Sequence, residues 1–263
     1  MKARGWMRNV FLFGAVLLLA HPAAVIADTM ILQVTSTDAF EMMGQKVPAK
    51  VDTSATWLAE GKARMDQGDT ATVIMLFDKN VVYMIDHSKK SYAEMSLDAL
   101  GDITKMMGID ENDEEGKAQL EMMKGMMSMM QMKVTVKATD ETRKIRDWNC
   151  KKYIVSASMG MGKVETETWA TEDAKIDFDT FREISQAFKG FLPGYKEVLE
   201  EMKKIKGFPV MSTAKVDMMG TQIQNVSEVI EVADKAAPAG TYELPEGYKK
   251  TEGMPPGMPG IKR

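Results

Sequence analysis

The part of the chain that follows residue 27 opens with a strand-like pattern of hydrophobic and polar positions. Segments at residues 30–35, 50–58 and 62–66 are bounded by glycine, proline and polar residues, which is typical of short β-strands. Residues 72–77 and 81–86 are apolar at nearly every position and are joined by three polar residues. We therefore expect a hairpin whose two faces are both covered by something other than water.

A helical period replaces this pattern twice. Ser96 precedes apolar residues at helical spacing over residues 97–107, and a methionine-rich helix is predicted from Lys117 to about Met132. Two further helices are predicted before and after Pro193-Gly194, and the second is expected to stop at Gly207. Strands are expected between and after the helices, at residues 133–138, 148–156, 163–170, 209–217 and 221–232.

This order of elements predicts one α+β domain over residues 28–250. We expect a largely antiparallel sheet with helices packed on one of its faces. Residues 251–263 are rich in proline and glycine and are predicted to form a disordered tail.

The first 27 residues have the pattern of a signal peptide. Lys2, Arg4 and Arg8 precede an apolar run at residues 10–20, and the run is followed by a small-residue pattern ending at Ala27. We expect cleavage after Ala27 and export, most simply to the periplasm. No cysteine lies near this position, so no lipid attachment is expected, and no later segment reaches the length of a membrane span.

Charge and composition exclude several function classes. The 263 residues include 34 Lys and Arg against 38 Asp and Glu, a net charge of −4, so nucleic acid is not an expected partner. One Cys and two His exclude an intramolecular disulfide and a histidine-rich metal site. The chain contains no G-x-S-x-G, G-x-G-x-x-G or Walker sequence. We therefore predict a protein that is not an enzyme, with no catalytic residue and no cofactor; the oligomeric state is left open.

Methionine is the unusual residue of this chain, with 26 copies. At about 100° per residue, six methionines of the predicted helix fall on one face. They are Met122, Met123, Met126, Met127, Met129 and Met130.

Three interpretations of this face are open. Its methionines fill a core where the helix packs on the sheet, or they form an adaptable surface for an apolar ligand, together with Met106 and Met107. The third interpretation is a Cu(I) site of clustered thioethers. Its ligands would be Met123, Met126, Met129, Met130 and Met132.

Other residues that could carry chemistry have simpler interpretations. Cys150, in a predicted strand, is expected to be a buried and inert thiol. His87 is expected in an exposed turn, and Trp57, Trp148 and Trp169 are expected to anchor the sheet in the core. The acidic stretch at residues 110–115 lacks the spacing of a calcium loop.

Several short motifs resemble a known family. They are Tyr83-Met84-Ile85-Asp86-x-x-x-Lys90-x-Tyr92, Trp148-x-Cys150-x-x-Tyr153, Thr168-Trp169-Ala170-Thr171 and Leu244-Pro245-x-Gly247-Tyr248. On these motifs the chain resembles an uncharacterised family of exported bacterial proteins with a domain of unknown function, similar in turn to the periplasmic lipoprotein carriers (LolA/LolB-like). The resemblance implies a strongly curved antiparallel sheet, an incomplete barrel, with helices on its concave face and a cavity for acyl chains.

We therefore expect a non-enzymatic periplasmic binding or carrier protein. Its ligand would be apolar, either lipid-like or a lipidated protein, and would lie between the curved sheet and the helices of residues 96–132. Two alternatives are a methionine-rich copper-binding or oxidant-buffering envelope protein, and a structural or interaction protein with a filled core.

Overall fold

The computed structural model describes residues 28–42, 44–100, 113–129, 133–159, 162–174, 176, 195–218 and 221–251. The predicted signal peptide, the helix before Pro193 and residues 252–263 of the predicted tail lie outside these residues.

Fourteen strands make up most of the described fold. They are β1 (Asp28–Thr37), β2 (Phe40–Met42), β3 (Gln45–Val47), β4 (Lys50–Ala59), β5 (Lys62–Gln67), β6 (Ala71–Leu76), β7 (Val81–Asp86), β8 (Ser91–Ser96), β9 (Lys133–Ile145), β10 (Trp148–Met159), β11 (Gly162–Thr171), β12 (Phe208–Met218), β13 (Thr221–Lys235) and β14 (Lys249–Lys250). Twelve of them form one sheet in the order β14-β8-β7-β6-β5-β4-β1-β13-β12-β11-β10-β9. Every pair is antiparallel except β14 with β8, which confirms the largely antiparallel sheet.

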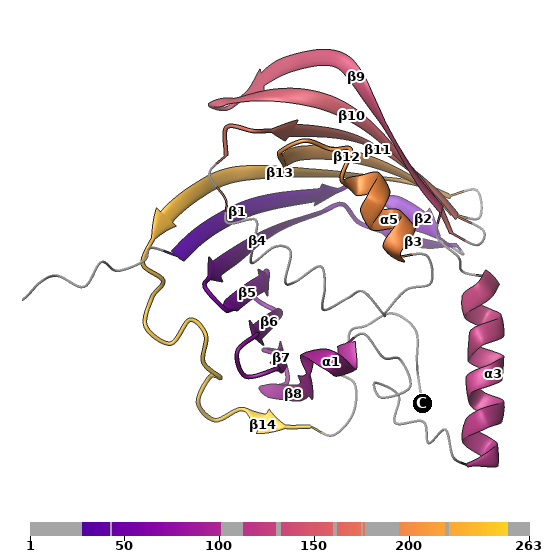
Figure 1. Ribbon diagram of the computed structural model, residues 1–263, viewed down its shortest axis with the longest axis vertical. Coiled ribbons are helices and arrows are strands. Elements are labelled where there is room, and N and C mark those ends of the chain that lie inside the picture. The colour runs from indigo at the N-terminus through magenta and orange to yellow at the C-terminus, as the bar shows by residue number, and fades with distance from the viewer. Residues whose placement is uncertain are drawn as a thin grey trace, which may run out of the picture.

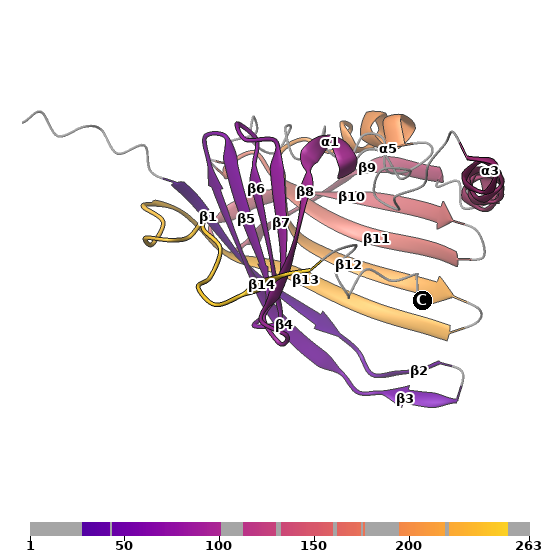
Figure 2. The same ribbon diagram turned by 90° about the horizontal axis from the view of Figure 1, so that it is seen from below.

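The large sheet curves strongly. Figure 1 shows it as an open arc that runs from β9 at the top to β14 at the bottom. Figure 2 shows β5–β8 nearly upright while β9–β13 run across the view, so the sheet also twists between its two ends. β1 joins the two halves, because it pairs with β4 on one side and with β13 on the other.

The expected α+β class, with helices packed on the concave face, is wrong: the described chain is mostly β, and its helices are few and short. They are α1 (Leu97–Leu100), α3 (Glu114–Met129) and α5 (Tyr195–Met202). α5 packs mainly against β9, α1 is a single turn beside β8, and α3 stands at the open side of the arc (Figure 1). The sequence pattern underestimated the strands. β9 continues from Ala138 to Ile145 through charged residues, because an edge strand pairs through its backbone whatever its side chains are.

Strands β6 and β7 are covered on both faces, as their pattern predicted. Met75 and Val82 belong to the main core inside the arc, whereas Ile74 and Ile85 belong to a second cluster on the other face. That second cluster is completed by residues from the C-terminal part of the chain, namely Tyr242, Leu244 and Tyr248. Figure 1 shows this segment passing outside the arc on its way to β14.

A chain of hydrogen bonds attaches the C-terminal segment to the outer face. Arg64 Nε donates to Asp66 over 2.9 Å, and Thr72 Oγ1 donates to the same carboxylate over 2.6 Å. The Thr72 hydroxyl thus accepts from His87 Nε2 over 2.8 Å, which leaves Nδ1 to accept from the Tyr248 hydroxyl over 3.0 Å. His87 lies in a turn, as expected, but it is half-buried rather than exposed, because its ring bridges β6 and the C-terminal segment.

Two more hydrogen bonds hold the same segment. Arg64 Nη1 donates to the carbonyl oxygen of Thr241 over 2.8 Å, and the Tyr242 hydroxyl donates to Asp28 over 3.3 Å. Burial, followed by the nearby Asp28 carboxylate, raises the pKa of Tyr242, so this hydroxyl keeps its proton and its role as donor.

Candidate binding face and its polar pocket

The concave face of β9–β13 is a continuous surface of uncharged side chains. The strand register aligns these side chains in three rows that cross all five strands. The first row is Val134, Ala157, Val164, Val216 and Ile223; the second is Val136, Val155, Thr166, Ala214 and Asn225; the third is Ala138, Tyr153, Thr168, Ser212 and Ser227. Most of these side chains are half-buried.

The opposite face of these strands carries charge on β9, β11 and β12. Of the fifteen residues that alternate with the three rows, seven are Lys, Asp or Glu. These seven are Lys133, Lys137, Lys163, Glu165, Glu167, Lys215 and Asp217. The corresponding outward positions of β10 and β13 are uncharged, so charged and uncharged side chains alternate on three of the five strands.

Helix α5 identifies the uncharged side as the inside of the arc. Ile205, in the turn after α5, packs with Val136, Tyr153 and Ala170 in a small cluster. Figure 1 shows α5 within the curve of the sheet. In addition, the main-chain N–H of Val136 donates to the Glu201 carboxylate over 2.9 Å. The Lys204 ammonium and this N–H lower the pKa of Glu201.

Gly207 holds the turn after α5 against β11. Its φ is +84°, and a Cβ at this position would lie 2.1 Å from the carbonyl oxygen of Thr171. Only glycine permits this close approach. The helix ends at Met202, earlier than the stop at Gly207 that the sequence predicts.

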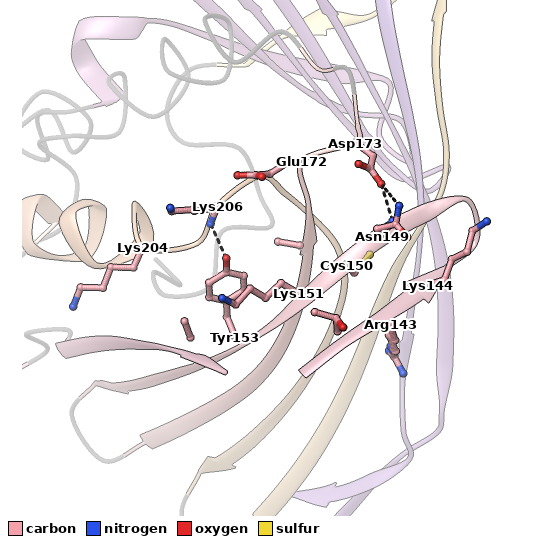
Figure 3. Close-up of a pocket in the computed structure, with 13 residues that line it drawn as sticks. Arg143, Lys144, Asn149, Cys150, Lys151, Tyr153, Glu172, Asp173, Lys204 and Lys206 are labelled. Carbon is pink, nitrogen blue, oxygen red and sulfur yellow. Dashed lines mark hydrogen bonds between the residues drawn. The ribbon is translucent and has the colours of Figure 1, made fainter. Parts of the chain in front are cut away.

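A pocket of about 740 Å³ opens at the end of the uncharged face where the third row lies (Figure 3). Ala138 and Tyr153, which belong to the third row, also line the pocket, so the two surfaces are continuous. The rest of its lining is mainly charged or polar. It comprises Thr142, Arg143, Lys144, Asn149, Cys150, Lys151, Ala170, Glu172, Asp173, Lys204 and Lys206.

Hydrogen bonds fix the pocket wall. Asp173 accepts from the main-chain N–H and the side-chain amide of Asn149, over 2.8 and 3.0 Å. On the other side, the main-chain N–H of Lys206 donates to the Tyr153 hydroxyl oxygen over 3.2 Å. Both sets of bonds are drawn in Figure 3.

Cys150 lies beside this pocket and is 3% exposed. Its burial raises the pKa of the thiol, which disfavours the reactive thiolate. The prediction of a buried cysteine is confirmed. Trp169 is also buried in the core, with Arg143 stacked 4.0 Å from its ring centre, and Trp148 packs at the core margin. Trp57 is half-buried and contacts Lys235 at 5.6 Å.

The methionine-rich helix exists as α3, but the structure describes few of its predicted ligand residues. Met106, Met107, Met130 and Met132 lie outside the described residues. The side chains of four others also lie outside them, namely Met123, Met126, Met127 and Met129. Met122 is 73% exposed, so it fills no core within the described structure.

The methionines that do fill a core lie in strands. Met30, Met75 and Met84 are all buried in the sheet. Within the described residues, no three His, Cys, Asp or Glu side chains gather into a group that could hold a metal ion. None of the described helices has the length and apolar character needed to cross a membrane.

Residues 40–248, from β2 to the tyrosine that bonds His87, match the family described as a domain of unknown function (DUF4412). The chain belongs to this family. No curated protein matches the chain. The DUF4412 domain therefore contains the uncharged face, the pocket and nearly all of the outer C-terminal segment.

Sequence reasoning missed the uncharged face as a site. The alternation within each strand was visible, but the strand order and register that bring fifteen such residues together were not. The pocket residues were missed because they come from three separate stretches, at 138–153, 170–173 and 204–206.

Proposed function

We propose that this DUF4412 protein is a non-enzymatic binding or carrier protein for an apolar ligand, either a lipid or a lipidated protein. The observation that carries the proposal is the row structure of the concave face. Fifteen adjoining positions on β9–β13 carry no charge, while the other face of the same strands is charged at seven of fifteen positions. A face that met only water would have no reason to exclude charge.

The side chains of this face suit an apolar guest. Valine, alanine, serine and threonine predominate, and such short side chains leave the ligand space close to the sheet. Burying one methylene group is worth about 0.8 kcal/mol, so an acyl chain of about a dozen carbons gains roughly 10 kcal/mol before entropy losses. Its binding should depend weakly on salt, because burial of apolar surface involves no charge.

Helix α3 is proposed as the movable side of this site. It stands at the open side of the arc and carries the exposed Met122 (Figure 1). Flexible thioether side chains repack around guests of different shapes. We also propose that residues 1–27 direct export to the periplasm, where the lipoprotein carriers that the sequence resembles work; N-terminal sequencing of the protein from the envelope fraction tests this.

The test of the binding face compares two adjacent residues of β10. Ala157 lies on the concave face and Ser156 on the convex face. Ala157→Lys should lower the affinity for a neutral fluorescent probe such as Nile red at least tenfold, whereas Ser156→Lys should leave it unchanged. Thermal melting of both variants checks that they fold. Equal binding by both folded variants would overturn the proposal.

Native mass spectrometry of protein purified gently from its own envelope fraction complements this test. A bound lipid or acyl mass supports the proposal. A bare chain mass that persists after lipid is added contradicts it, and favours the filled-core interpretation.

A further inference from the structure

The lining of the pocket in Figure 3 is positively charged, whereas the chain as a whole is negatively charged. The lining includes five basic and two acidic side chains, a formal charge of +3, in a protein whose net charge is −4. Such a local excess of positive charge attracts anions.

The basic residues of the pocket are not equally available. Arg143 stacks on Trp169, and Lys204 pairs with Glu201 over 2.6 Å. Within the described part of the chain, Lys144, Lys151 and Lys206 form no ion pair. Figure 3 shows Lys151 beside Tyr153 and Lys206 next to its hydroxyl, whereas Lys144 points away.

Tyr153 supplies a donor between these two lysines. Its side chain is 2% exposed, and its oxygen accepts the main-chain N–H of Lys206. None of the described residues accepts a hydrogen bond from the Tyr153 hydroxyl group. A buried hydroxyl gains stability by donating as well as accepting, so a ligand oxygen beside it would complete its bonding.

Together these features form a site for an anionic oxygen at the end of an apolar surface. We propose that the pocket binds the anionic headgroup, a carboxylate or a phosphate, of a ligand whose tail lies on the concave face. The two lysines would supply charge, and Tyr153 would supply one hydrogen bond. This inference rests on the proposed function and narrows its ligand class to anionic amphiphiles.

The position of the pocket sets the orientation of the ligand on the concave face. Tyr153 lies beside the pocket and Ala157 lies four residues along the same strand, about 13 Å away at the usual rise of a strand. The tail therefore runs from the third row to the first. Over this distance, each added methylene should raise the affinity about fourfold.

The test uses four ligands with ten-carbon chains: decanoate, whose tenth carbon is the carboxylate carbon, decyl phosphate, decanol and decyltrimethylammonium. Their affinities are measured by displacement of Nile red from the full chain. Decanoate and decyl phosphate should bind at least tenfold more tightly than decanol, and the cationic ligand should bind more weakly. The tenfold preference should shrink at high salt, because screening weakens the attraction between charges.

Matched variants assign the preference to the pocket. Lys151→Gln combined with Lys206→Gln should reduce the affinity for decanoate to that for decanol, and leave the affinity for decanol unchanged. The second substitution retains the main-chain N–H that bonds Tyr153. Lys163→Gln, on the convex face, is the control and should change neither affinity.

The outcomes separate the two proposals. If decanol and decanoate bind equally, the headgroup site is wrong and the proposed function stands. If no ten-carbon ligand binds, the proposed function fails, and the headgroup site fails with it. If inorganic phosphate binds as tightly as decyl phosphate, and Ala157→Lys leaves both unaffected, the pocket is a site for free phosphate and the amphiphile proposal is overturned.

Discussion

Glu201 accepts a hydrogen bond from the main-chain N–H of Val136, over 2.9 Å. This bond connects α5 to the outermost strand of the sheet. β9 is an edge strand, so its outward N–H groups have no neighbouring strand to bond. The carboxylate satisfies one of them and holds α5 on the concave side, beside the uncharged rows.

The Glu201 bond should make α5 docking depend on pH. Because the pKa of Glu201 is lowered in the folded protein, its contribution to stability is complete above the ordinary glutamate pKa of about 4.3. The contribution is lost as the pH falls through the lowered value. Glu201→Gln should lower the melting temperature at pH 7, and this difference should vanish in acid. Glu200→Gln, which removes an exposed partner of Lys203 only, is the control; equal shifts in both variants would contradict this role.

Gly207→Ala should be far more destabilising than Gly240→Ala. Both glycines have similar φ angles, +84° and +81°, so each alanine has the same backbone penalty, about 1 kcal/mol. Only Gly207 also meets Thr171, at 2.1 Å, whereas Gly240 has open space. The clash should cost about 1–3 kcal/mol more. Urea unfolding of both variants measures the difference, and similar losses would show that the turn moves to relieve the contact.

Thr72→Val should destabilise the outer attachment of the C-terminal segment. Valine has the shape of threonine, but it would leave Asp66 and His87 without their shared partner. Thr72 is 1% exposed, so the expected loss is about 1–3 kcal/mol. Tyr248→Phe keeps the ring packed at right angles to His87 and should cost about 1 kcal/mol. Limited proteolysis should cut the segment more readily in both variants; unchanged cleavage would argue against the network as the attachment.

Substitutions on the methionine-rich helix separate the ligand hypothesis from the copper hypothesis. Replacing Met123, Met126 and Met130 with glutamine should weaken binding of an apolar probe, and replacing them with leucine should retain it, because leucine is also apolar. A Cu(I) site would behave differently, since leucine has no thioether. Stoichiometric Cu(I) uptake that disappears when the methionines of residues 122–132 become leucine would support copper binding instead.

Most of the strands could be predicted from the sequence, but the full length of β9 and the assembly of the sheet could not. Because β6 and β7 are apolar on both faces, the sequence predicted that both faces are buried. In the structure, Tyr242, Leu244 and Tyr248 cover the outer face. Nothing in the local pattern indicated that this cover lies more than 150 residues away. The packing of helices on the sheet was overestimated, because the helices of the described residues are few and short.

The candidate site was less predictable than the fold. The exposed Met122 belongs to a face that the sequence did indicate, but the uncharged rows arise only when five strands align. The Glu201 bond to Val136 joins positions 65 residues apart and has no local signal. Short-range patterns report which face of an element is apolar, and they do not report which elements meet.

The position of β1 also sets the order in which this protein can fold. Its partner β13 and the cover of β6 and β7 are both made more than 100 residues after these strands. In an emerging chain, β1 therefore lacks its neighbour β13, and the outer surface of β6 and β7 is uncovered until residues 242–248 appear. Folding of this domain therefore depends on the synthesis of β13 and residues 242–248, and loss of these residues exposes the hydrophobic surface of strands made earlier.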